Sequence, residues 1–109
     1  MFKVTRKINP GDVIGIKQYY VDKLAKFNLT VEPRRFRGNM YYYYVLLYDG
    51  RIKWKITPVV TYNNKILKFR LLHYYTSKYH VQDTAWGTLR GFRELMLKII
   101  QHEEYEISE

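Results

Sequence analysis

The stretch that decides the fold is YYYYVLLYDGRIKWKI, residues 41–56, with its continuation TPVVTYNNKILKFRLLHYY to residue 75. Asp49-Gly50 separates two runs that are rich in aromatic and β-branched residues. This is the strongest local signal for a β-hairpin, because a type I′ turn needs two residues that tolerate positive φ. Asn63-Asn64 is a second, weaker turn signal. Two-residue turns at both places predict a three-stranded antiparallel meander over about 40–48, 51–62 and 65–75.

Tight turns also fix how the strands pair. Tyr48 would lie opposite Arg51, and Trp54 would then lie between Val45 and His73. Partners on adjacent strands share one side of a sheet. The apolar side, expected in the core, collects Tyr41, Tyr43, Val45, Leu47, Ile52, Trp54, Ile56, Pro58, Val60, Leu67, Phe69, Leu71, His73 and Tyr75. The other side, expected to be exposed, collects Tyr42, Tyr44, Leu46, Tyr48, Arg51, Lys53, Lys55, Thr57, Val59, Ile66, Lys68, Arg70, Leu72 and Tyr74.

Helical periodicity flanks the meander on both sides. An Asn-Pro-Gly-Asp start precedes apolar residues at helical spacing, which predicts an amphipathic helix over 10–27. A second helix is expected from a cap at Asp83 or Thr84 to about residue 102. Trp86 lies on the apolar stripe of this helix, so it is expected in the core, as is Trp54. Proline cannot donate to a ladder, so Pro58 in the middle strand predicts a kink or one-sided pairing.

The length of 109 residues predicts one domain, 1–109, with a short acidic tail over about 103–109. Residues 2–8 alternate as an added N-terminal edge strand would. The expected fold is α+β, an antiparallel meander of three main strands with two amphipathic helices packed on one face. The apolar run 40–48 is less than half of a membrane span and no signal peptide is visible, which predicts an intracellular protein without membrane contact. The absence of cysteine excludes disulfides and thiolate sites.

Positive charge dominates the chain, whose formal net charge is +9. Fifteen of the nineteen Lys and Arg residues lie within 1–75. Such an excess predicts a polyanionic partner, DNA or RNA, because Lys and Arg neutralise phosphates and aromatic rings stack on unpaired bases. The candidate contact residues come from the basic side of the sheet and an Arg-rich loop over 34–37: Arg34, Arg35, Arg37, Tyr42, Tyr44, Arg51, Lys53, Lys55, Lys68, Arg70 and Tyr74.

Two alternatives remain open. Apolar residues on the basic side, such as Leu46 and Leu72, fit a homodimeric assembly module of a virus or mobile element. Glu32, beside the basic loop, forms with Asp22 and His80 the alternative set for a metal-dependent nuclease. No catalytic signature and no paired-ligand spacing occurs in the sequence. The leading interpretation is therefore a binding protein with no catalytic residue, no metal ligand and no cofactor.

The predicted order of helix, three-stranded meander and helix over about 10–102 is similar to the αβββα layout of double-stranded-RNA-binding domains. Those domains carry a Lys-Lys-containing start on their second helix, where this chain has DTAWGTLR, residues 83–90. The resemblance therefore covers topology and not the phosphate clamp of that family. In composition, the Cys-free chain with its run YYYYVLLYDGRIKWKI resembles the small orphan proteins of viruses of thermophilic archaea. That resemblance implies a viral or mobile-element protein in the cytoplasm of a host cell.

Overall fold

The computed structural model describes residues 18–35, 42–60 and 66–108. Five strands form one antiparallel sheet in the order β1-β2-β3-β4-β5. The elements are α2 (Gln18–Ala25), β1 (Leu29–Arg35), β2 (Tyr42–Tyr48), β3 (Arg51–Val60), β4 (Ile66–Tyr75), β5 (Lys78–Trp86) and α3 (Leu89–Ser108). The predicted α+β class is confirmed, and the predicted three-stranded meander becomes five strands.

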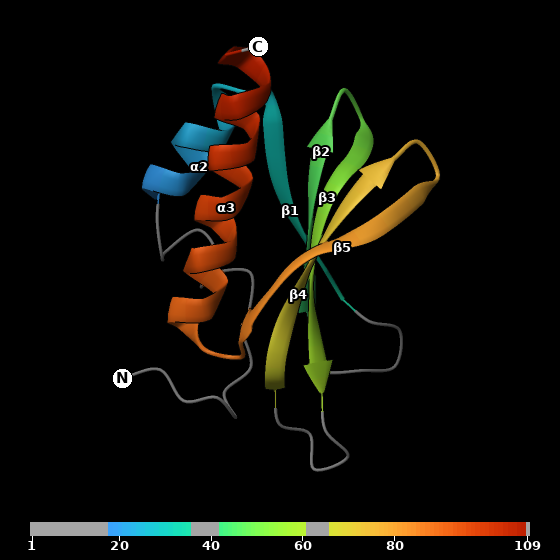
Figure 1. Cartoon of the computed structure of the whole chain (residues 1–109), viewed down its shortest axis with the longest axis vertical. Helices are drawn as coiled ribbons and strands as arrows, with labels where there is room; N and C mark the ends of the chain where they lie inside the picture. Colours follow the sequence, from blue (N-terminus) through green and yellow to red (C-terminus); the bar gives the residue numbers. More distant parts are fainter. Residues whose placement is uncertain (1–17, 36–41, 61–65, 109) are drawn as a thin grey trace.

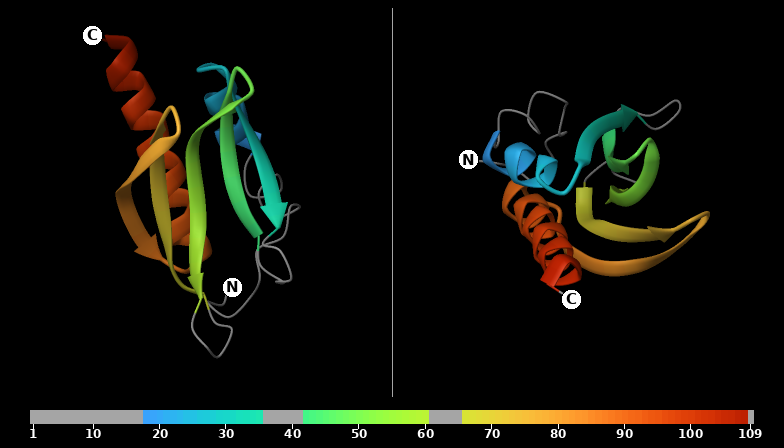
Figure 2. Two further views of the ribbon diagram at one scale, coloured as in Figure 1. Left: turned by 90° about the vertical axis from the view of Figure 1, so that its right-hand side faces the viewer. Right: turned by 90° about the horizontal axis from the view of Figure 1, so that it is seen from above.

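Both helices lie next to each other on one face of the sheet, which is strongly twisted (Figures 1 and 2). Apolar side chains of α2, α3 and this face form the core. Removing apolar surface from water is the main favourable term in folding, at about 25 cal/mol per Å². The fully buried side chains of this core are Leu24, Tyr44, Leu46, Trp54, Ile56, Phe69, Leu71, Phe92, Leu95 and Ile99, and Val45 is fully buried on the opposite face of the sheet.

A β-bulge between β2 and β3 overturns half of the predicted register. Tyr48 pairs with Arg51 as predicted, but the register then shifts and Leu46, not Val45, lies opposite Trp54. Lys53 is the extra residue on β3, with no partner in β2. Because side chains alternate along a strand, one inserted residue exchanges the two sides of everything beyond it. The whole of β2, together with Arg51 and Ile52 of β3, therefore turns the opposite set of side chains toward the helices.

The pairing of β3 with β4 follows the prediction along most of its length. Trp54 lies opposite His73, as expected. A second register shift between Val59 and Val60 leaves Leu67 exposed, where it was predicted in the core. Pro58 pairs with Phe69 on β4, and the ladder to β2 ends before Pro58, so it has the one-sided pairing that a proline tolerates. The predicted Asn63-Asn64 turn lies outside the described residues.

The segment after β4 is where the sequence prediction is wrong. The sequence predicts a helix from Asp83 or Thr84 and a connector before it over 76–82, but residues 78–86 form the edge strand β5. The helix begins at Leu89, and Thr88, not Asp83 or Thr84, caps it: the Gly91 amide donates to Thr88 Oγ1 at 3.0 Å. Most β5 side chains are exposed and its register shifts between Leu71 and Leu72 of β4, so no regular apolar alternation marks this strand.

The N-terminal part of the fold is only partly described. Of the predicted helix over 10–27, residues 18–25 form α2 and residues 26–27 form a turn, while residues 10–17, like the predicted strand over 2–8, lie outside the described residues. Asn28 adopts a φ of 61° just beyond the helix, a conformation that Asn tolerates. Five strands between the helices also exclude the αβββα order. Within the described ranges, no helix has the length and apolarity needed to cross a membrane.

Candidate functional site

The sheet face opposite the helices, named here the outer face, is defined by strand pairing. Lys55 pairs with Val45 and Leu72, while its neighbours Trp54 and Ile56 point into the core. The residues that alternate with the core set across the sheet are Thr30, Glu32, Arg34, Tyr43, Val45, Leu47, Ile52, Lys55, Thr57, Val59, Lys68, Arg70, Leu72, Tyr74, Tyr79, Val81, Thr84 and Trp86, of which Val45 and Leu72 are buried beneath their neighbours. Cationic and aromatic side chains thus share a surface that neither helix covers.

The Lys55 ammonium lies between two tyrosine rings on this face. Its Nζ is 5.1 Å from the ring centroid of Tyr43 and 5.4 Å from that of Tyr74. Tyr74 in turn packs beside Tyr79 of β5, with ring centroids 5.2 Å apart. These contacts, within about 6 Å of the ring centre, are cation–π interactions that hold the ammonium in place without neutralising it. The centre of the outer face is therefore both aromatic and positive.

Positive charge on the outer face is largely uncompensated. Glu32 is the one acid in the set, and its carboxylate accepts from Arg34 Nε at 3.1 Å. Among residues that the structure describes, no ion pair reaches Lys55, Lys68 or Arg70. An uncompensated cation at a half-buried position keeps its attraction for an anion from outside, because no partner charge cancels its field.

Two aromatic residues on β5 extend this surface beyond what the sequence predicted. Tyr79 is half exposed, and Trp86 has 75% of its surface exposed, the largest value among the exposed large apolar side chains. Trp86 was expected in the core, but it pairs with Lys68 on the outer face. Both were missed because β5 was predicted as a connector and a helix start. The short alternation of Tyr79 with Val81 was the available signal.

Two of the predicted basic residues lie on the other side of the sheet. The bulge directs Lys53 toward α3, where its Nζ donates to Glu103 at 3.0 Å and to Glu106 at 3.1 Å. Arg51 pairs with Tyr48, which lines a depression together with these acids and is therefore also on the helix side. The prediction that Lys53 and Arg51 join the basic face is wrong, because it assumed a ladder without a bulge.

The remaining predicted contact residues divide into three groups. Lys55, Lys68, Arg70 and Tyr74 lie on the outer face as predicted, and Arg34, predicted in a basic loop, lies on this face as part of β1. Tyr44, predicted to be exposed, is 1% exposed and packs edge-on against Phe92 in the core, while its neighbour Tyr43 takes the outer position. Arg35 and Tyr42 belong to β1 and β2, not to a loop, but their side chains lie outside what is described, as does Arg37.

A polar cluster on the helix side contains all three histidines of the chain. His73 stacks on Trp54 with ring centroids 4.0 Å apart and lies 4.9 Å from His102 and 5.6 Å from His80. Burial, and then the neighbouring histidines, lower the pKa of His73 to about 4. A ring that is 4% exposed and beside two other imidazoles resists protonation, because a buried charge loses its hydration.

The same cluster holds a charge network centred on Glu103. Glu103, only 4% exposed, accepts hydrogen bonds from Trp54 Nε1 at 2.9 Å and from Lys53. Ligand atoms of His102, Glu103 and Glu106 lie within 4.8 Å of one another, a spacing that a metal ion could use. The Lys53 ammonium already contacts both carboxylates. Burial alone would lower the pKa of Lys53, but the hydrogen bonds and charges of the two glutamates raise it. Lys53 therefore acts as the cation of this network.

The three residues of the alternative nuclease site do not lie together. Glu32 lies on β1 and His80 on β5, at opposite edges of the five-stranded sheet, and Asp22 lies on α2. Three groups so distributed cannot share one metal ion. No protein-family model, curated protein or solved structure matches the chain.

Proposed function

We propose that the protein binds nucleic acid through the outer face. The observation that carries the proposal is the array of Lys55, Lys68 and Arg70, none of them paired with an acid among the described residues, interleaved with Tyr43 and Tyr74. Phosphate groups would pair with the cations and release counterions, and the rings would contact sugars and bases. The overall charge of +9 adds long-range attraction for a polyanion.

The spacing of the cations suits a linear polymer. Arg70 pairs with Thr57 on β3 and Thr84 on β5, and Lys68 lies two residues further along β4. Residues two apart on a strand are about 6.6–6.8 Å apart, and neighbouring strands are about 4.7–4.9 Å apart. Lys55, Arg70 and Lys68 thus follow one another diagonally across β3 and β4 at distances comparable with successive phosphates along one strand. A small anion would use only one of these cations.

The experiment is a salt titration of binding to fluorescent single-stranded and duplex oligonucleotides. In the double variant Lys55→Gln with Arg70→Gln, we expect weaker binding and a slope of log K against log salt that is smaller by about 1.4, at roughly 0.7 per lost phosphate contact on a single strand. Both side chains are outside the core, so the far-UV spectrum and unfolding midpoint should remain close to wild type.

A matched control removes the same charge elsewhere. Lys26 follows α2 and Lys78 begins β5 opposite Tyr75, both are exposed, and neither belongs to the outer face. The double variant Lys26→Gln with Lys78→Gln has the same net charge as the first and should keep most of the wild-type slope. Equal losses in both variants would show that binding follows net charge alone, and this would refute the outer face as the site.

A further inference from the structure

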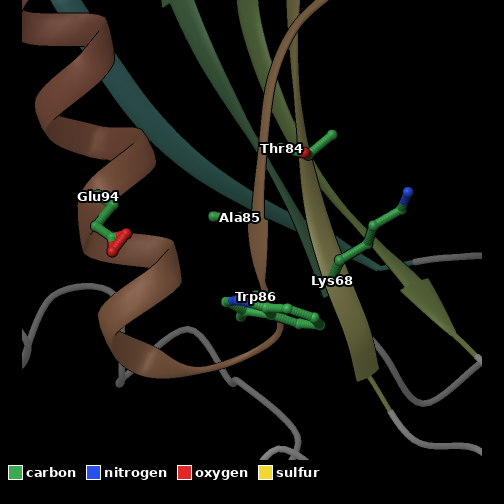
Figure 3. Close-up of a pocket in the computed structure, with 5 residues that line it drawn as sticks. All are labelled: Lys68, Thr84, Ala85, Trp86 and Glu94. Carbon is green, nitrogen blue, oxygen red and sulfur yellow. The ribbon is translucent and has the colours of Figure 1, made fainter.

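Trp86 lies at a shallow depression where β5 meets α3. The depression has a volume of about 370 Å³ and is lined by Lys68, Thr84, Ala85, Trp86 and Glu94. Figure 3 shows the indole at the end of β5, with Lys68 beside it on β4 and Glu94 on the helix. The volume is at the small end of the range of about 300–1,000 Å³ that small-molecule sites occupy. It suits one flat ring system better than a globular partner.

The backbone that carries this exposed indole is held tightly. A Cβ at Gly91 would collide with the carbonyl oxygen of Trp86, and a Cβ at Gly87 would lie 2.6 Å from the backbone of Ile66. The Gly87 amide also donates to the Leu67 carbonyl at 3.1 Å. Two glycines thus allow α3 and β4 to approach both sides of the turn that follows Trp86. A large apolar ring on a fixed backbone needs little ordering when it binds.

The charges around Trp86 distinguish a base from a phosphate. Lys68, opposite Trp86 on β4, offers one cation at the rim. Glu94 lines the opposite side, with Arg90 Nε 4.0 Å from its carboxylate, and this carboxylate can accept a hydrogen bond from the exocyclic amino group of a base, which a phosphate group cannot donate. The arrangement therefore favours binding in which the base stacks on the indole of Trp86 and its phosphate pairs with Lys68.

We propose that Trp86 is a stacking platform for an unpaired base, which makes single strands the preferred nucleic acid of the outer face. The proposal rests on the proposed function. A base inside a duplex is already stacked on both sides, so an exposed indole gains nothing from it unless the base leaves the helix. An unpaired base has a free face, and its stacking on Trp86 adds to phosphate contacts at Lys68, Arg70 and Lys55.

The two tryptophans permit a direct test. Trp54 is fully buried and Trp86 is exposed, so acrylamide, a neutral quencher, should quench only the emission of Trp86 in the free protein. A bound single-stranded oligonucleotide should protect this emission, and a duplex of the same sequence should not. Trp86→Ala should weaken single-strand binding about 5- to 150-fold, the cost of one lost base stack, and should leave the salt slope unchanged.

A control variant at Tyr19 and three possible outcomes test the stacking site. Tyr19 is 55% exposed on α2, away from the outer face, and Tyr19→Ala should bind like wild type. If single strands bind with the salt slope of the outer face but Trp86→Ala has no effect, or the duplex binds as tightly, the stacking site is refuted and the proposed function stands. If no oligonucleotide binds at any salt concentration, both are refuted. A concentration-dependent dimer that Trp86→Ala abolishes, seen by light scattering, would instead assign Trp86 to self-association.

Discussion

Lys53 and Lys55 are two residues apart on one strand and have opposite environments. Lys53, at the bulge, is fixed by two carboxylates on α3, while Lys55 on the outer face contacts the rings of Tyr43 and Tyr74. In a regular strand both would have shared one side, since residues i and i+2 do. One extra residue therefore separates a cation that stabilises the fold from a cation that is available to a partner.

The largest expected effect tests the bulge itself. Tyr44→Ala should lower the free energy of unfolding by about 3–5 kcal/mol, because it removes a ring that is 1% exposed and packed on Phe92. Tyr43→Ala, on the outer face, should cost about 1 kcal/mol or less. Urea unfolding of both variants measures the difference. The reverse order would mean that β2 follows the register without a bulge.

A second prediction concerns the network that holds Lys53. Glu103→Ala should destabilise the protein by about 3 kcal/mol, because it leaves Trp54 Nε1 without its acceptor and Lys53 with one carboxylate only. Glu104, the next residue on α3, is exposed, and Glu104→Ala should change stability by less than about 0.5 kcal/mol. Similar unfolding midpoints for the two variants would contradict a structural role for the network.

A third prediction uses the lowered pKa of His73. The ordinary value of 6.5 applies to the unfolded chain and about 4 to the folded one, so between these pH values the unfolded chain binds one more proton. Stability should therefore fall as the pH is lowered from 6.5 toward 4, by at most about 1.4 kcal/mol per pH unit from this group. His73→Phe should show a shallower fall over the same window in urea unfolding. Parallel curves would show that His73 does not carry this dependence.

Much of the fold was predictable from the sequence because its signals are local. Asp49-Gly50 predicted the first hairpin, and a two-residue turn at Asn63-Asn64 predicted the observed pairing of Trp54 with His73. No local signal marks the bulge at Lys53, and the charge of Lys53 is balanced by Glu103 and Glu106 of α3, about fifty residues later. β5 was missed because an exposed edge strand needs no apolar side, and hydrophobic periodicity reports only burial.

The candidate site was correspondingly predictable in part. The prediction placed four residues on the outer face correctly: Lys55, Lys68, Arg70 and Tyr74. It did so because β4, which carries the last three, follows the expected register against β3. The bulge puts Tyr43 on the outer face in place of Tyr44, which was predicted there. Tyr79 and Trp86 were not predicted on this face because β5 was not predicted as a strand. The wrong placements in the predicted site therefore come from two features of the backbone, the bulge at Lys53 and the strand β5, and not from the chemistry assigned to the residues.

The last prediction compares Lys55 with Lys53, and Lys55→Met has the smallest expected effect on stability. Lys55→Met should lower the free energy of unfolding by no more than about 1 kcal/mol, the value of an exposed cation–π contact. It should nevertheless weaken single-strand binding and reduce the salt slope by about 0.7, because one phosphate contact is lost. Lys53→Met should do the opposite: it should destabilise the protein by leaving buried Glu103 without its cation, and it should leave the slope unchanged. Unfolding and salt titrations of the two variants form one experiment, since the substitutions are chemically identical. A slope reduced equally by both would place Lys53 at the bound strand and would contradict the division of the two faces by the bulge.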